Sequence, residues 1–235
     1  TCDFENVFWR VERRANQFAH EGKLDGYHAT NILRALTRSQ RNKMCGQDKT
    51  FVALEPVILA NLEAISDRDL THVMYAYGVR GLGNPELHEV LERRLELMAD
   101  RLDYPSMFNA IYYLLFRENT NAKIWRQILD NVVSQEAVLP LIYYKPFKAS
   151  WIWMRNAFPE WDLRDYYDRF YNAERYFNVS KFQDLYESDV KYAKFKAFLT
   201  AHCHVYPVPF CSVENLFTLH YVFWEQKIAI NYHLD

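Results

Sequence analysis

The chain has 235 residues, of which 50% are hydrophobic and 17% aromatic, and its formal net charge is −2. This composition excludes a disordered or low-complexity chain, because it supplies enough apolar side chains for a core without disulfides or metals. The near balance of 28 basic and 30 acidic residues argues against a dedicated nucleic-acid-binding domain, which is usually strongly basic, although it permits a local basic patch.

The four cysteines are few and unevenly spaced, unlike the pattern of a secreted disulfide scaffold. We therefore expect reduced thiols and an intracellular, soluble protein. No apolar run approaches the roughly 18 residues that a membrane-spanning helix requires, so no transmembrane segment is predicted.

Residues 66–100 are predicted to form two helices joined by a short turn. In 84–98 the apolar residues recur at helical spacing along one face, and charged residues occupy the other face. Asn84 is expected to cap this second helix, and Ser66 or Asp67 to cap the first one. The glycines that would allow left-handed helix ends between them are Gly78, Gly81 and Gly83.

The next segment, 103–133, repeats this plan, and a shift of 37 residues makes the apolar positions of the two units coincide. A weaker copy lies upstream at a shift of 41, where 30–36 align with 71–77. Its second helix would cover 50–65, with Pro56 bending or restarting it. The pairs matched by the 37-residue shift are Leu70 with Met107, Met74 with Ile111, Tyr75 with Tyr112, Leu87 with Ile124, Leu91 with Ile128, and Leu95 with Val132.

A period of 37 to 41 residues with two helices per unit is typical of an α-solenoid, in which each hairpin buries its apolar stripe on its neighbour. The alternative is an ordinary helical domain whose helix spacing produces the matches by coincidence. We predict an all-α fold with two regions. A short α-solenoid of helical hairpins would cover 1–135, and an aromatic-rich helical extension would cover 136–235.

The C-terminal region is predicted to remain helical to its last segment. Residues 149–157 would begin a fourth, degenerate unit, and further helices are expected over 162–177, 179–201 and 212–230. The tail "KIAINYHLD" is expected to form a short strand or an extended arm.

Soft metal ligands gather in "AHCHVYPVPFC", residues 201–211, between two of these helices. Zinc requires four converging ligands, and the spacing here matches no zinc motif. A Cys–His nucleophile would also need an orienting group and an oxyanion hole. We therefore interpret the segment as an inter-helix connection with buried cysteines, and metal binding stays the open alternative. The residues concerned are His202, Cys203, His204, Cys211 and His220.

The chain contains no Walker A sequence, no H-E-x-x-H and no G-x-S-x-G. No catalytic residue, cofactor or metal is therefore predicted, and the protein is not expected to be an enzyme.

Two features suggest binding to other macromolecules. Basic residues on the first two helices, starting with Arg10, Arg13 and Arg14, could face phosphate, or lie on solvated helix faces. The surplus of Tyr and Trp in the C-terminal third is typical of protein interfaces, although rings also fill wide gaps between helices. The candidate phosphate or RNA contacts are Arg34, Arg38, Arg41 and Lys43, and the candidate protein-interface residues are Trp151, Trp153, Trp161, Tyr166, Tyr167 and Phe223.

The stretch "LTHVMYAYGVRGLGNPELHEVLERRL" resembles the heptatricopeptide-like repeats of the FAST-kinase and RAP-domain group. Those repeats also pair an "A-hydrophobic-G" first helix with a "pelf..l" second helix. The match covers 66–133 and, more weakly, 28–65. The resemblance implies a mitochondrial protein that handles RNA or joins a large assembly.

The near-neutral charge and the aromatic surplus favour the second of these roles. We expect a non-catalytic scaffold or accessory subunit of a large mitochondrial multiprotein complex, with other protein subunits as its partners. The alternative is an organellar RNA-binding helical-repeat protein.

Overall fold

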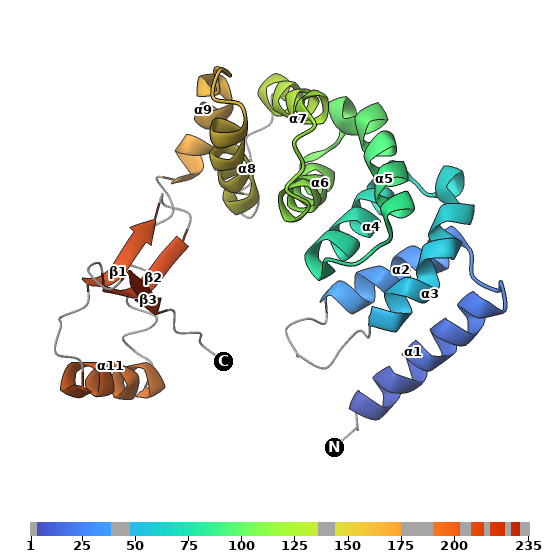
Figure 1. The fold of residues 1–235 in the computed structure, drawn as a ribbon, viewed down its shortest axis with the longest axis horizontal. Coiled ribbons are helices and arrows are strands. Elements are labelled where there is room, and N and C mark those ends of the chain that lie inside the picture. Colours follow the sequence, from blue (N-terminus) through green and yellow to red (C-terminus); the bar gives the residue numbers. More distant parts are fainter. Residues whose placement is uncertain are drawn as a thin grey trace.

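The computed structural model describes residues 4–38, 48–135, 144–174, 190–202, 208–213, 217–223 and 227–230. From Phe4 to His202 the regular elements of this described part are helices, so the all-α prediction is confirmed there (Figure 1). The helices are α1 (Phe4–His20), α2 (Gly26–Arg38), α3 (Asp48–Ala60), α4 (Asp67–Arg80), α5 (Pro85–Met98), α6 (Tyr104–Phe116), α7 (Ala122–Ser134), α8 (Tyr144–Ala157), α9 (Arg164–Glu174) and α11 (Val190–His202), with short 3-10 turns at Leu62–Ala64 and Ala99–Arg101.

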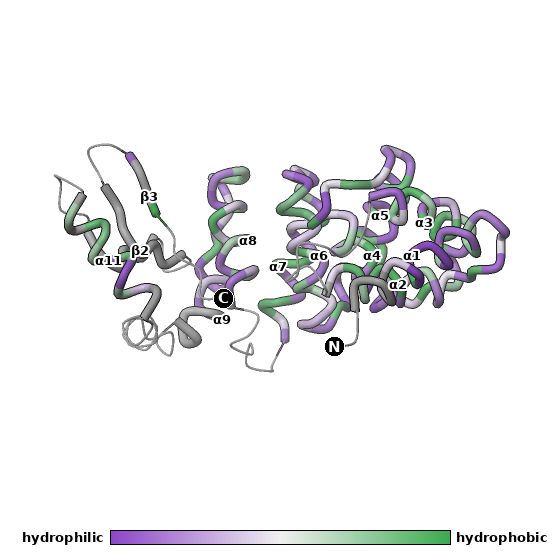
Figure 2. Tube along the Cα trace, turned by 90° about the horizontal axis from the view of Figure 1, so that it is seen from below, coloured by the Kyte–Doolittle hydropathy of each residue, from purple (hydrophilic) through white to green (hydrophobic). Residues whose placement is uncertain are grey.

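Successive helices form pairs that stack in two layers. The helices α2, α4, α6 and α8 pack on one another in chain order and line the inner side of an arc, whereas α5, α7 and α9 lie on its outer side (Figure 1). Helix α1 packs against α3 at the N-terminal end of the stack. Figure 2 shows the helices side by side along the longest axis, with apolar and hydrophilic segments alternating along them. An α-solenoid of hairpins stays our interpretation of this arrangement.

Polar side chains cap the helices of the two central pairs, as predicted for Ser66 and Asn84. Each cap oxygen accepts a hydrogen bond from a backbone N–H in the first turn, as Asn84 does from Leu87 at 2.7 Å. Because the first turn of a helix leaves its N–H groups without internal partners, these caps determine where each helix begins. The caps are Ser66 for α4, Asn84 for α5, Asp103 for α6 and Asn121 for α7.

Two of the three glycines expected at a helix end are found there. Gly81 ends α4 in the left-handed conformation with φ 62°, and Gly83 follows with φ 108°. Gly78 instead lies within α4, where an added Cβ would come 3.1 Å from the Cα of Tyr113 in α6. The prediction of a left-handed stop at Gly78 is therefore wrong, because this glycine allows two inner helices to approach closely.

The two residues of each pair matched by the 37-residue shift are buried to a similar extent. Full burial of one such aliphatic side chain contributes about 1.5–3 kcal/mol, so these pairs supply much of the packing energy between units. The completely buried matched pairs are Leu70 and Met107, Met74 and Ile111, Leu87 and Ile124, Leu91 and Ile128, and Leu95 and Val132.

The upstream copy follows the pattern only in part. Leu33 is completely buried like its counterpart Met74, but Ala35 is exposed where Ala76 is buried. Helix α3 passes through Pro56 and continues to Ala60, so the proline does not restart the helix.

The hydrophobic core continues across residue 135, where the sequence suggests a change of region. Helix α8 packs against α6 and α9 packs against α7, which extends both layers of the stack. One connected cluster of buried residues accordingly runs from Ala29 in α2 to Tyr166 in α9. Helix α8 therefore takes the place of the fourth unit, and it begins at Tyr144 rather than at 149.

The C-terminal helix predicted over 212–230 is wrong. This part of the chain forms an antiparallel sheet in the order β1-β2-β3, and the short strand expected in the tail is its last member. Aromatic and β-branched residues, as in "FTLHYVF", favour strands, and the apolar spacing alone did not distinguish the two structures. The strands are β1 (Val208–Val213), β2 (Phe217–Phe223) and β3 (Ile228–Ile230).

Candidate interaction surfaces

Helices α4 and α6 each leave one face uncovered on the inner side of the arc. Their other faces pack on neighbouring inner helices and on the outer layer, so the partly exposed positions recur at helical spacing along one line. These positions are Arg68, His72, Tyr75 and Val79 in α4, and Pro105, Phe108, Tyr112, Leu115 and Phe116 in α6.

Four of these side chains are rings in mutual contact, and we call Tyr75, Phe108, Tyr112 and Phe116 the inner aromatic stripe. Tyr75 and Tyr112 meet edge-to-face with ring centroids 5.7 Å apart, and Phe108 lies 4.9 Å from Tyr112. Phe116 stacks on Tyr112 at 5.9 Å and is 53% exposed. Because the rings restrict one another, they lose little further freedom when a partner covers them.

The two tyrosines of the stripe combine an apolar ring with a polar hydroxyl. Burial raises the pKa of Tyr75 and of Tyr112 above the usual value for a phenol. Both hydroxyls therefore stay protonated at physiological pH and can donate hydrogen bonds. This combination of apolar area and a neutral donor is what protein interfaces favour in tyrosine.

The aromatic residues predicted as interface anchors are largely used within the fold. Tyr166 is completely buried, and its hydroxyl shares a 2.6 Å hydrogen bond with the hydroxyl of Ser150. The prediction of Tyr166 as a surface anchor is therefore wrong, since the ring fills space between α8 and α9. The remaining described members pack half-buried against the core: Trp151, Trp153, Trp161 and Tyr167.

Basic groups lie over two of these indoles. The Arg126 guanidinium is 4.1 Å from the centre of the Trp161 ring, and the Lys148 ammonium is 5.1 Å from that of Trp151. Such cation–π contacts occupy ring faces that a partner would otherwise use. Phe223 lies in β2, but its side chain lies outside the part that the structure describes.

Arg34, a predicted phosphate contact, makes an ion pair within the protein. Its guanidinium donates to Asp69 at 2.8 Å and so links α2 to α4. A phosphate at Arg34 would have to compete with this carboxylate. Arg41, Lys43 and the side chain of Arg38 lie outside the described residues.

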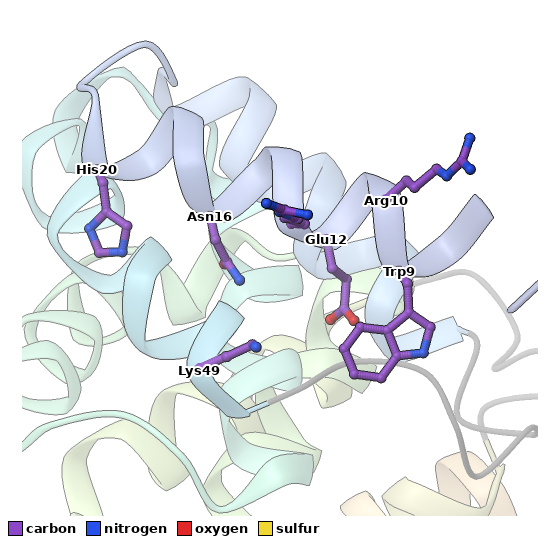
Figure 3. Close-up of a pocket in the computed structure, with 7 residues that line it drawn as sticks. Trp9, Arg10, Glu12, Asn16, His20 and Lys49 are labelled. Carbon is purple, nitrogen blue, oxygen red and sulfur yellow. The ribbon is translucent and has the colours of Figure 1, made fainter. Parts of the chain in front are cut away.

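A second surface is a groove of about 630 Å³ between α1 and α3, which we call the α1–α3 groove (Figure 3). Trp9 and Glu12 point from α1 toward α3, and Lys49 points back from α3 (Figure 3). Trp9 is 52% exposed, and the Lys49 ammonium lies 5.9 Å from its ring. The residues lining the groove are Trp9, Arg10, Glu12, Arg13, Asn16, His20 and Lys49.

Two oxygen-bearing side chains lie deep in the α1–α3 groove. Glu12 is only 4% exposed and accepts a hydrogen bond from the Thr50 hydroxyl at 3.3 Å, which connects α1 to α3. The side-chain oxygen of Asn16 is buried and accepts no hydrogen bond. The groove is therefore lined by three basic side chains. Of its two buried oxygen groups, the Glu12 carboxylate accepts a hydrogen bond from Thr50, whereas the Asn16 oxygen accepts none.

The sequence patterns pointed to neither surface as a whole. Arg10 and Arg13 form part of a basic group in the sequence, but Trp9 and Lys49 join them only because α1 packs against α3. For the inner aromatic stripe a signal existed in "MFNAIYYLLF", where rings recur three and four positions apart. That spacing is equally typical of a buried helix face, so it did not separate the two cases.

The metal question concerns residues largely outside the described part of the chain. Within the described part, no group of three or more His, Cys, Asp or Glu side chains is placed to hold a metal ion. Cys203 and His204 fall outside it, as do the side chains of His202, Cys211 and His220. None of the described helices combines the length and the apolar character that crossing a bilayer requires.

Comparison with known proteins adds no relatives: no family model matches the chain, and no curated protein is significantly similar to it.

Proposed function

We propose that this protein is a non-catalytic helical scaffold that binds another protein through its inner face, as an accessory subunit of a larger assembly. The observation that carries the proposal is the inner aromatic stripe, which presents interlocked and partly exposed rings across two successive helix pairs. Aromatic side chains in this kind of ordered, accessible cluster dominate the binding energy of many protein interfaces.

The position of the stripe on the stack supports this function. Helices α4 and α6 are supported from behind by α5 and α7, so the rings lie on a rigid base. An inner surface of stacked hairpins is extended and continuous, which suits a long segment of a partner rather than a small molecule. The mitochondrial setting of the assembly is part of the proposal and derives from the repeat resemblance alone.

The proposal is tested by replacing the most exposed ring of the stripe. Phe116→Ser removes apolar area at a 53% exposed position, so the fold itself should be little affected. Leu97→Ser is the matched control, because Leu97 is 66% exposed on the outer helix α5. Tagged full-length variants are compared by native migration size and by the stoichiometric partners that co-purify with each.

We expect the unmodified protein and Leu97→Ser to migrate in a complex far larger than the monomer, with the same companions. Phe116→Ser should shift toward the monomer and lose at least one companion. An unchanged complex in Phe116→Ser, or a monomer in all three proteins, would contradict the proposal.

RNA binding by the same inner face is the second candidate function. The observation that favours it is the line of Arg68 and His72 next to Tyr75 on α4. Proteins that bind single strands combine rings for base stacking with basic groups for phosphates. A salt titration separates the two functions: affinity for an RNA oligonucleotide that falls steeply with salt, and that Phe116→Ser weakens, favours this second candidate.

A further inference from the structure

We propose that the α1–α3 groove binds an acidic peptide segment of a partner protein. This site lies between α1 and α3 at the N-terminal end of the stack, and no residue of the inner aromatic stripe lines it. The inference therefore goes beyond the proposed function and can fail or succeed independently of it.

The charges around the groove favour an anionic ligand. Arg13 and Lys49 contribute positive charge to its lining, against the single carboxylate of Glu12, and the Arg10 guanidinium points away from α3 (Figure 3). Glu12 is buried and bonded to Thr50, so its charge is partly used in holding α1 on α3. The accessible part of the groove is thus basic, and carboxylates can form charge-assisted hydrogen bonds with its guanidinium and ammonium groups.

The accessible side chains of the groove favour a peptide as the anionic ligand. A polypeptide backbone offers N–H groups at every residue beside its acidic side chains. We take an acidic peptide as the ligand because its carboxylates and apolar side chains can alternate, which suits the Lys49 ammonium beside the Trp9 indole, and RNA is the competing outcome of the test.

Trp9 provides the apolar contact that such a peptide needs. Its indole is 52% exposed at one end of the groove and lies near the Lys49 ammonium (Figure 3). An aromatic or aliphatic side chain of the ligand can pack on this ring while neighbouring carboxylates reach Lys49 and Arg13. Exposed Trp beside basic groups is a common composition for the anchor of a protein interface.

The experiment uses the full chain and a fluorescein-labelled peptide of alternating glutamate and phenylalanine, followed by fluorescence polarisation. Arg13→Gln combined with Lys49→Gln should weaken binding by about tenfold or more, because two charge-assisted contacts are lost. The matched control is Arg93→Gln combined with Lys123→Gln, which removes the same charge at exposed positions of α5 and α7. Trp9→Ala should also weaken binding, and Phe116→Ser should leave it unchanged.

Three results would overturn the inference. One is no measurable binding of the peptide to the unmodified protein. Another is an equal loss in the groove variant and in its control, which would indicate a general charge effect. The third is an RNA oligonucleotide that displaces the peptide and depends on Arg13 and Lys49, which would assign the groove to nucleic acid.

Discussion

Tyr75 and Tyr112, separated by one 37-residue unit in the sequence, meet edge-to-face with their ring centroids 5.7 Å apart. They lie in successive inner helices, α4 and α6, so the contact joins two helix pairs. Ring contacts of this kind between units add to the binding of neighbouring hairpins, which otherwise depends on buried aliphatic side chains. Both rings remain partly accessible in this contact. The same two side chains that join α4 to α6 therefore also belong to a candidate binding surface.

The outer helix α5 tests the assignment of core and surface. Leu91 is completely buried, whereas Leu97 on the same helix is 66% exposed. We expect Leu91→Ala to lower the free energy of unfolding by about 2–5 kcal/mol, because it removes packed atoms and leaves a cavity. Leu97→Ala should change it by less than about 0.5 kcal/mol. Urea unfolding measures both, and equal effects would mean that the face of α5 is assigned wrongly.

Gly83 tests the turn between α4 and α5. Its φ is 108°, and an added Cβ would lie 2.7 Å from Nε2 of His88. Gly83→Ala should therefore destabilise the protein by more than the roughly 1–2 kcal/mol of an unfavourable backbone conformation, since the imidazole must also move. Gly22→Ala is the control: its φ is also positive, at 65°, but nothing lies within 4 Å of the added atom. Thermal unfolding should rank the unmodified protein first, then Gly22→Ala, then Gly83→Ala.

We expect the protein to lose stability in mild acid because His88 is buried as a neutral ring. Its Nε2–H donates to the carbonyl oxygen of Leu82 at 3.0 Å, and its Nδ1 faces the Tyr113 hydroxyl at 3.1 Å, which suits a neutral ring. Burial, together with the charge of Arg117, lowers the pKa of His88 below its usual value. The unfolded chain therefore binds the proton more readily than the folded one, and this contribution to stability is lost as pH falls.

The pH effect of His88 is measured by comparison with a variant that cannot titrate. The midpoint of thermal unfolding should fall for the unmodified protein as the pH drops below about 6.5, the usual value for histidine. His88→Gln should be less stable at neutral pH but should fall less steeply over the same range. Parallel curves for the two proteins would show that the ring titrates normally in the folded state.

Tyr166 tests whether its ring is internal. Tyr166→Phe keeps the ring but removes the 2.6 Å hydrogen bond with Ser150, so we expect a loss of about 0.5–1.5 kcal/mol in unfolding free energy. Ser150→Ala should cost more, because it also removes the 2.8 Å hydrogen bond that this hydroxyl donates to the Phe147 carbonyl oxygen. The double variant should cost less than the sum, since both changes remove the bond between Tyr166 and Ser150. Native migration of the complex should not change. A smaller complex with normal stability would instead restore Tyr166 as an interface residue.

The amino-acid sequence by itself determined the central helical pairs of this protein and the caps of α4 and α5. Asn84 and Asp103 act on backbone groups within the same turn, and apolar spacing marks the buried face of each helix. These are local effects, so a single sequence displays them. Where two structures satisfy the same local pattern, as in 212–230, that information was insufficient and the predicted helix is a sheet.

Only the tertiary structure decided which rings are buried and which charges are already paired. Tyr166 and Tyr112 look alike in the sequence, yet one is enclosed by α8 and α9 and the other remains partly open on the inner face. Arg34 became an internal ion-pair partner because α2 packs against α4, and Lys49 reached Trp9 because α3 packs against α1. Exposure and charge pairing depend on contacts between residues far apart in the chain, and those contacts exist only once the helices are stacked.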